Sequence, residues 1–305
     1  MAPPKFSDLN KQVSDIFNKG YFFNVFKLDV KTRTANGVNF NVIGEHNTET
    51  SKTAGSLETK YVVPEYGLTF LEKWNTDNLL KCEITADNRL AEGFKIVFDA
   101  SLTPNTGNSY ERIHFGMKTR PLSLDITSQR KKTAELRTAY THDRAHVETN
   151  VVFDTAGPIL NGAIVLGHQG WLAGYQYVFN TARSLLTKNN FAVGFKAKDF
   201  TLYANMNDGN EVGGSVYQRV NDRLETGVQL AWTAGSNQTR FALASKYQLD
   251  SQTVVGAKVN NICQVGLSFQ QLLRPGVKLT LSALFEARNL NAGGHKVGFG
   301  LELDA

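Results

Sequence analysis

The stretch Phe26-Lys27-Leu28-Asp29-Val30-Lys31 alternates apolar and charged residues without a break. Successive side chains of a β-strand point to opposite faces, so this pattern places the apolar side chains on one face and the charges on the other. The same period of two recurs at many places in the chain, including residues 38–42, 57–61, 80–84, 224–232, 277–283 and 296–303. The sequence therefore predicts an all-β protein from residue 22 to the C-terminus.

The number of these runs favours a closed barrel. At about 14 residues per strand and turn, the chain would supply on the order of twenty strands, each near the ~10 residues that a tilted strand needs to cross a bilayer. Turn signals such as Asn36-Gly37 separate the runs, and no Pro-, Gly- or Ser-rich linker divides the chain. A barrel that is apolar outside and polar inside leaves no free sheet edge. A soluble all-β binding protein is the alternative on this pattern alone, because alternation is a weak signal in each strand.

Composition narrows the class of protein. Apolar residues make up 41% of the 305 residues and charged residues 20%, which is ordinary for a folded protein. No run approaches the ~18–20 apolar residues of a transmembrane helix, so a membrane protein of this composition has to be a barrel. Cys82 and Cys263 show neither metal-ligand spacing nor a disulfide framework. The first 20 residues lack the apolar core of a secretory signal peptide, which disfavours an exported bacterial porin.

Residues 5–19 carry the one convincing helical period. Phe6, Leu9, Val13, Ile16 and Phe17 fall on one face of a helix, and Gly20 would end it. A helix of about 15 residues is marginal on its own in water. Its apolar face is therefore expected to dock on another part of the protein.

Glu72 interrupts the apolar face of its predicted strand. The period-two set Leu68, Phe70, Glu72 and Trp74 places a carboxylate among aliphatic and aromatic residues. A charge that faces hydrocarbon costs several kcal/mol unless it is protonated or paired. The alternative is that Glu72 lies near a strand end or that a bulge turns it inward.

No catalytic constellation stands out. The sequence lacks a P-loop, a nucleophile elbow and an HExxH motif, so we expect no enzyme activity, no catalytic residue, no metal and no cofactor. The histidines show no zinc-ligand spacing at His46, His114, His142, His146, His168 and His295.

Several longer strings are similar to those of one family. They are Lys19-Gly20-Tyr21, Gly55-Ser56-Leu57-Glu58-Thr59-Lys60-Tyr61, Glu72-Lys73-Trp74-Asn75-Thr76-Asp77-Asn78, Gly170-Trp171-Leu172-Ala173-Gly174-Tyr175-Gln176 and Asn291-Ala292-Gly293-Gly294-His295-Lys296. They closely resemble the voltage-dependent anion channel, the mitochondrial porin of eukaryotes, and the resemblance spans nearly the whole chain. It implies a transmembrane β-barrel of about 19 strands, a number taken from the family, with residues 1–20 as a pore helix inside a barrel of residues 21–305.

The resemblance also implies a function and a location. It points to a voltage-gated, weakly anion-selective channel for ATP, ADP, phosphate and chloride in the mitochondrial outer membrane. The last strand agrees, because Lys296, Gly298, Leu301 and Leu303 resemble the sorting signal of mitochondrial barrels. A protein-import barrel of the same superfamily is the alternative; it would be expected to have a longer N-terminal segment and a less basic lumen.

Residues 108–129 depart from the family pattern. Residues 112–120 read like the family's segment at this point, and residues 130–154 match the same segment in outline. We therefore predict a duplicated hairpin with Pro121 at its turn. It would either add two strands to the wall or form a loop at one mouth; a loop is favoured, because a wider barrel would pack its helix less closely.

Candidate lumen residues follow from the polar half of the alternation. The net charge is +5, which indicates a mild preference for anionic partners. Lysines on the lumen face would raise the local concentration of anions without binding them tightly. The lysines expected there are Lys27, Lys31, Lys60, Lys95 and Lys278.

Other functional residues rest on the resemblance alone. It implies ATP contact at Lys11 and Lys19, a hinge at Gly20, and a role for Glu72 in gating and in docking hexokinase. It further implies NAD contact at Gln264, Val265, Gly266, Ser282, Ala283, Leu284, Phe285 and Glu286. That contact should be weak, because no glycine-rich phosphate loop is present and Glu286 adds a negative charge. The expected partners are membrane lipid, small anions, adenine nucleotides, hexokinase, apoptosis-regulating proteins and further copies of the chain, but no nucleic acid.

Overall fold

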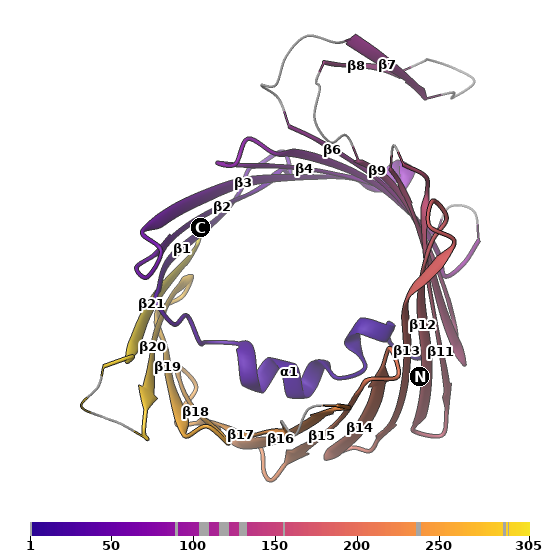
Figure 1. Cartoon of the computed structure of the whole chain (residues 1–305). Coiled ribbons are helices and arrows are strands. Elements are labelled where there is room, and N and C mark those ends of the chain that lie inside the picture. Colours follow the sequence, from indigo (N-terminus) through magenta and orange to yellow (C-terminus); the bar gives the residue numbers. More distant parts are fainter. Residues whose placement is uncertain are drawn as a thin grey trace.

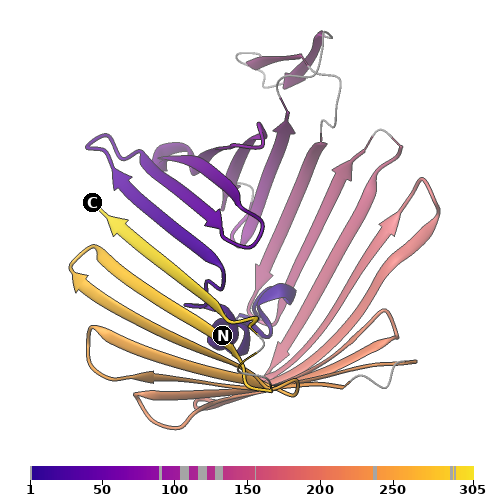
Figure 2. The same cartoon turned by 60° about the vertical axis from the view of Figure 1, so that its left-hand side comes forward.

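Strands follow one another from Val25 to Asp304, and 19 of them join into one sheet that closes on itself (Figures 1 and 2). The computed structural model describes residues 2–88, 91–103, 110–115, 122–127, 133–154, 156–235, 239–288, 291 and 293–305, with the backbone alone at 110–115 and 122–127. The predicted all-β barrel of about 19 strands around an N-terminal helix is confirmed.

The barrel strands have the following bounds. They are β1 (Val25–Arg33), β2 (Asn39–Asn47), β3 (Lys52–Val63), β4 (Leu68–Asn75), β5 (Leu80–Asp87), β6 (Phe94–Leu102), β9 (Thr133–His142), β10 (Ala145–Phe153), β11 (Ile159–His168), β12 (Trp171–Asn180), β13 (Leu185–Lys196), β14 (Phe200–Asn207), β15 (Glu211–Arg219), β16 (Leu224–Thr233), β17 (Thr239–Gln248), β18 (Thr253–Asn260), β19 (Gln264–Arg274), β20 (Val277–Glu286) and β21 (Lys296–Asp304). A short 3-10 turn, η2 (Pro64–Tyr66), precedes β4.

The barrel closes between its first and last strands. β1 pairs in parallel with β21, with Phe26 opposite Phe299 and Val30 opposite Leu303. Every other neighbouring pair described in this sheet is antiparallel, so strand direction alternates along the chain. The first and nineteenth strands of such a series run the same way and can pair only in parallel. Closure leaves this sheet without a free edge.

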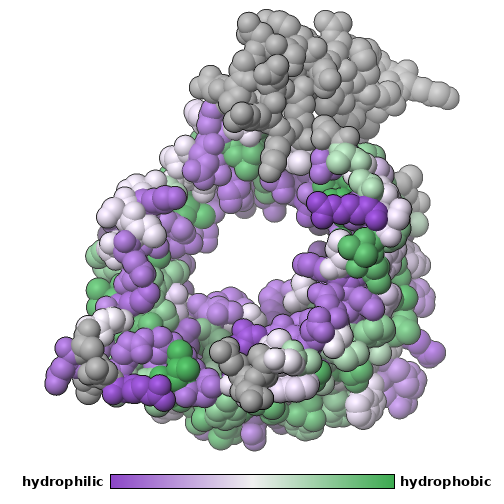
Figure 3. All heavy atoms as spheres, viewed as in Figure 1, coloured by the Kyte–Doolittle hydropathy of each residue, from purple (hydrophilic) through white to green (hydrophobic). Residues whose placement is uncertain are grey.

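The two faces of the wall differ in polarity. On β1, Phe26 and Leu28 are 47% and 44% exposed on the outer face, while Lys27 and Asp29 line the lumen. Large exposed apolar side chains recur on the strands around the barrel, and hydrophilic residues gather at the rim of the central opening (Figure 3). An apolar exterior with a polar interior is the pattern of a transmembrane barrel.

The N-terminal segment lies inside the barrel, with its first residues against β11 and β12 and its helix against β15–β17 (Figure 1). The predicted helix over residues 5–19 is divided into a 3-10 turn, η1 (Phe6–Asp8), and an α-helix, α1 (Lys11–Asn18). The break falls at Leu9 and Asn10, where Leu9 and the later apolar residues pack on separate parts of a curved wall. A straight helix would not reach both parts. No helix among the described residues has the length and apolar character needed to cross a bilayer.

Two further strands lie within residues 108–129, the stretch that departs from the family pattern. β7 (Tyr110–Phe115) and β8 (Leu122–Thr127) pair with each other in a separate two-stranded sheet. In the barrel, β6 pairs directly with β9, with Phe98 opposite Leu136. The turn predicted at Pro121 lies outside the described residues.

Candidate functional site: the lumen and its helix

The apolar face of α1 is buried against the lumen wall. Val13, Ile16 and Phe17 pack on Tyr217 of β15 and Ala244 of β17. Val13 is only 1% exposed. Strand alternation does not predict these wall positions, since it assigns polar residues to the lumen face. The signal was present as apolar or small residues on the lumen face of consecutive strands.

A second apolar contact holds the start of the segment. Leu9 packs on Val165 of β11 and Ala192 of β13. A Cβ added to Gly174 of β12 would lie 2.8 Å from the Phe6 ring and 3.0 Å from Leu9 Cδ1, so this glycine makes room for the segment. The segment is therefore seated at two places along the wall.

Polar contacts fix the position of the helix further. Thr201 donates a hydrogen bond of 2.6 Å from Oγ1 to Gln12 Oε1, and Ser215 donates one of 2.6 Å from Oγ to Asn10 Oδ1. Lys258 donates from Nζ to the Phe17 carbonyl at 2.7 Å, close to the end of the helix. A cation at this end complements the helix dipole. Sequence reasoning did not single out Lys258, because it looks like any other lysine on a polar face.

The structure brings four of the predicted lysines together. Lys19, Lys27, Lys31 and Lys278 line one recess of about 840 Å³ between the helix and the wall. Lys19 pairs with Asp15 at 2.7 Å, Lys27 with Glu45 at 3.2 Å and Lys278 with Glu302 at 3.3 Å. The recess thus carries cations whose charge is partly neutralised, which suits transient attraction of anions better than tight binding.

The remaining predicted lysines lie elsewhere. Lys11 pairs with Asp8 at 3.9 Å and stands eight residues before Lys19, about 12 Å along a helix axis. Lys95 lines a second recess of about 460 Å³, with Lys5, Arg137 and Lys188 among its other cations.

Lys60 is placed by its strand register. It lies opposite Leu71, two positions along β3 from Glu58 and so on the same face of the strand. It therefore faces away from the membrane side of β3, where Tyr61 is 43% exposed.

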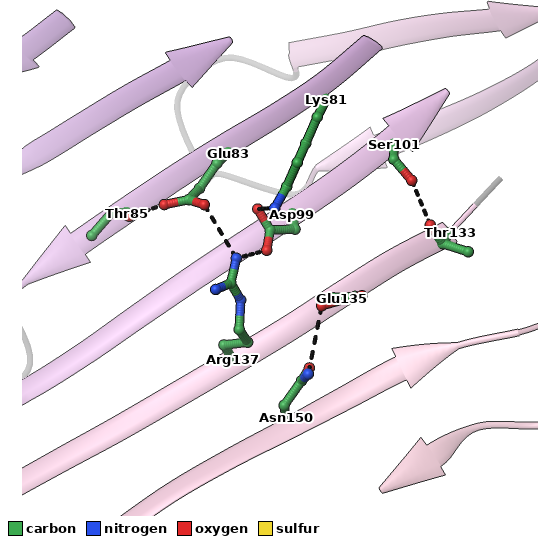
Figure 4. A network of polar contacts seen from close by, with 9 residues as sticks. All are labelled: Lys81, Glu83, Thr85, Asp99, Ser101, Thr133, Glu135, Arg137 and Asn150. Atoms are coloured by element: carbon green, nitrogen blue, oxygen red, sulfur yellow. Dashed lines mark hydrogen bonds and ion pairs between the residues drawn. The ribbon is translucent and has the colours of Figure 1, made fainter. Parts of the chain in front are cut away.

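A polar network covers the wall across the lumen from α1 (Figures 1 and 4). Arg137 of β9 contacts both Asp99 of β6 and Glu83 of β5, the latter at 3.1 Å, and Lys81 Nζ lies 3.5 Å from Asp99 Oδ1. Asp99 is 3% exposed. Two cations face two anions, so these four side chains together carry no net charge. A buried carboxylate is tolerated only when it is paired in this way.

Replacing Arg137 by glutamine should lower both stability and anion preference. Asp99 would keep only Lys81 at 3.5 Å, and a buried charge left wholly unpaired costs about 3–5 kcal/mol, so the loss should be part of that amount. The urea midpoint of the refolded barrel should fall, and the reversal potential in a KCl gradient should move toward potassium. The double variant Arg137→Gln/Asp99→Asn restores neutrality and should recover part of both losses. An unchanged midpoint in the single variant would contradict this role of Arg137.

The residues predicted to contact NAD lie on the neighbouring strands β19 and β20, and their side chains are divided between the lumen face and the outer face. β19 and β20 place Gln264 opposite Glu286 and Gly266 opposite Leu284, and Gln264 Nε2 lies 2.5 Å from Glu286 Oε1. Gln264, Gly266 and Leu284 line a small lumen recess of about 260 Å³. The alternate residues point outward instead; these are Val265, Ala283 and Phe285, of which Phe285 is 38% exposed.

Glu72 lies in the middle of β4 on the outer face. It stands between Phe70 and Trp74, which are 39% and 55% exposed. Its cross-strand neighbours are Thr59 of β3 and Cys82 of β5, with no register shift in either pairing. The structure thus places the Glu72 carboxylate on the membrane side, with neither a bulge nor a strand end nearby.

The closed barrel, its apolar exterior and its open, basic lumen define a membrane porin. The sequence model of the eukaryotic porin family matches residues 2–127 and 116–298, and the chain belongs to this family. The two matches overlap, as an internally repeated stretch would produce, and the duplicated hairpin stays a prediction.

Relatives of known name match the chain end to end. It is 52% identical to the Xenopus laevis non-selective voltage-gated ion channel VDAC2, covering 100% of both chains. It is 51% identical to the Homo sapiens non-selective voltage-gated ion channel VDAC1, covering 100% of this chain and 99% of the other. These matches confirm the resemblance found in the sequence. A solved mutant of the Rh. blastica porin aligns with a TM-score of 0.47 at 14% identity, over 87% of this chain and 98% of that chain.

Proposed function

We propose that this chain is a voltage-gated, weakly anion-selective channel through which chloride, phosphate, ATP and ADP diffuse across the mitochondrial outer membrane. The observation that carries the proposal is an open passage bordered by hydrophilic residues (Figure 3), together with the lysines that line the recess beside the docked helix. Membership of the eukaryotic porin family and the names of the relatives support voltage gating. The location in the mitochondrial outer membrane is supported by the resemblance of the sequence to the mitochondrial porin of eukaryotes.

The charge arrangement supports weak selectivity. Lysines in the recess beside α1 attract anions, while nearby carboxylates such as Asp15 and Glu302 keep any one site from holding them. Conduction requires sites weak enough to release their ions. Within this scheme, Lys11 and Lys19 would meet nucleotide phosphates in passing.

The charges on the N-terminal segment limit what it contributes to voltage sensing. Residues 2–20 contain three lysines and two aspartates, a net of one positive charge from side chains. Moving one charge across the whole field is worth about 2.3 kcal/mol per 100 mV. A steep voltage response would therefore need charges of the wall to move as well.

Partners are proposed at two places on the wall, Glu72 of β4 and the NAD set of β19 and β20. Glu72 on the outer face is suited to contact lipid and partners within the membrane, such as hexokinase or a further copy of the chain. The lumen-facing residues of the NAD set, Gln264 and Gly266 among them, would give a weak dinucleotide contact. An unchanged conductance on addition of NAD would remove the second of these.

Planar-bilayer recording of the refolded full chain tests the main proposal. We expect a large conductance that falls as voltage of either sign increases, with a reversal potential in a KCl gradient that favours chloride. Absence of conductance, or a conductance that does not respond to voltage, would overturn channel function. A reversal potential that favours potassium would overturn anion selectivity alone.

The lysines of the recess should set this reversal potential. Neutralising Lys27 and Lys31 together, by Lys27→Gln/Lys31→Gln, should move it toward potassium, because two lumen cations are lost. The shift should be larger in dilute than in concentrated KCl, since salt screens exposed charges over about 10 Å at 0.1 M. Lys198→Gln is the matched control, at a turn between β13 and β14. Equal shifts in the control and the double variant would show that position in the lumen is irrelevant.

A further inference from the structure

The linker between the pore helix and β1, residues 19–24, is bonded to the wall at several consecutive positions. Ser268 of β19 donates from Oγ to the Gly20 carbonyl at 2.7 Å. The Phe22 amide donates to Ser282 Oγ of β20 at 3.0 Å, and the Asn24 amide to the Val297 carbonyl of β21 at 2.8 Å. The linker thus steps across three neighbouring strands with its backbone attached to each.

Phe22 sits directly on two glycines of the last strand. A Cβ at Gly298 would overlap the Phe22 carbonyl group, and one at Gly300 would lie 2.7 Å from the Phe22 ring. Neither glycine has a positive φ, so backbone conformation does not require glycine there. What excludes a side chain is the close approach of the linker. We call Gly298, Gly300 and Ser282 the linker seat.

Tyr21 and Phe23, on either side of Phe22, both contact Lys258 of β18. The Lys258 ammonium lies 4.1 Å from the centroid of the Tyr21 ring and 5.0 Å from that of Phe23, while bonding to the Phe17 carbonyl. Cation–π contacts of this length are attractive, the more so when water is excluded. Lys258 therefore ties the end of α1 to the linker.

Gly20 is also confined. Its φ of 86° suits glycine, but a Cβ there would run into the Gln270 side chain of β19. Its carbonyl is already bonded to Ser268. By contrast, the far end of the segment is held through side chains, by the packing of Phe6 and Leu9 on the wall and by an ion pair between Lys5 and Glu148 at 3.3 Å.

We propose that the linker seat, together with Lys258, anchors the base of the pore helix to the last strands, so that β21 positions the helix for voltage gating. Gly20 is then not a free hinge, and movement of the segment begins at its N-terminal end, near Lys5. The part concerning gating rests on the proposed channel function. Attachment of the linker to the wall does not depend on channel function and can be measured separately by hydrogen exchange.

Gly298→Ala tests the anchor in protein refolded in vitro, where a sorting role of Gly298 plays no part. We expect hydrogen exchange of the amides of residues 20–24 to accelerate by about tenfold, the effect of losing roughly one hydrogen bond. The voltage of half-closure should shift while the open-state conductance stays unchanged. Gly44→Ala is the matched control, a strand glycine of β2 where an added Cβ meets no atom within 4 Å.

Two further variants keep the test decisive if Gly298→Ala does not refold. Phe22→Ala removes the ring from Gly300, and Ser282→Ala removes the acceptor of the Phe22 amide. Both should accelerate linker exchange and shift the half-closure voltage in the same direction. Wild-type exchange and gating in both would overturn the proposal. If the unmodified protein shows no voltage response, the channel function fails, and the exchange data still decide whether the anchor exists.

Discussion

Replacing Val13 by aspartate should release the pore helix from the wall while the barrel stays closed. Val13 is 1% exposed and packs between Ile16, Phe17 and the wall residues Tyr217 and Ala244. A carboxylate buried there without a partner costs several kcal/mol. Each apolar side chain of the docked face contributes only about 1.5–3 kcal/mol. The variant would therefore lose much of what holds the helix.

Trypsin offers a direct measurement of this release. Lys11 and Lys19 flank the docked turns, and a released helix should be cut there much faster than a seated one. In bilayers the released segment should give a noisier open state and a shifted voltage of closure. Asn18→Asp is the control, since it adds the same charge at an exposed position of the same helix. Slow cleavage of the Val13 variant, at the rate of the control, would show that Val13 does not hold the helix.

The sequence was sufficient for the apolar face of this segment but not for its shape. Spacing identified Phe6, Leu9, Val13, Ile16 and Phe17 as the apolar face; the last four are buried and Phe6 is partly buried. The break at Leu9 and Asn10 depends on two contacts, with Val165 and Ala192 on one side and with Tyr217 and Ala244 on the other. The curvature between these patches belongs to the barrel. Local spacing in the segment carries no information about it.

Alternation likewise predicted the faces of the wall but not its exceptions. Lys27 and Glu72 lie on the faces that a period of two assigns to them. Val165 and Tyr217 break the rule of a polar lumen because the helix covers them, and this cannot be read from either strand alone. The parallel pairing of β1 with β21 also cannot be predicted from single strands, because it depends on whether the barrel has an odd or an even number of strands.

The ion pairs were the hardest part of the site to predict. Arg137 and Asp99 are 38 residues apart in sequence and meet because β6 pairs directly with β9. A sequence that contains 33 basic and 28 acidic residues offers many equally plausible partners. The lumen lysines could therefore be predicted as a set, whereas the degree to which Lys27 or Lys278 is neutralised required the strand register.

Glu72→Gln should stabilise the barrel in lipid and alter its gating. The Glu72 carboxylate lies on the membrane face between Phe70 and Trp74, where a charge costs about 1–3 kcal/mol more than a neutral group. Glutamine keeps the size and removes the charge, so the urea midpoint in lipid vesicles should rise. Labelling by an apolar carbodiimide should fall, because the reactive carboxyl within hydrocarbon is gone.

The matched control for this prediction is Glu58→Gln, whose pair with Lys73 is the register position next to that of Glu72. Glu58 lies opposite Lys73 on the lumen face of β3 and β4, whereas Glu72 lies opposite Thr59 on the outer face. Removing the Glu58 charge leaves Lys73 without its neighbour and should not raise the midpoint, since the lumen is wet. If both variants stabilise the barrel equally, the gain comes from reducing negative charge in general. If Glu72→Gln changes neither stability, labelling nor gating, the outward carboxylate has no special role in the wall.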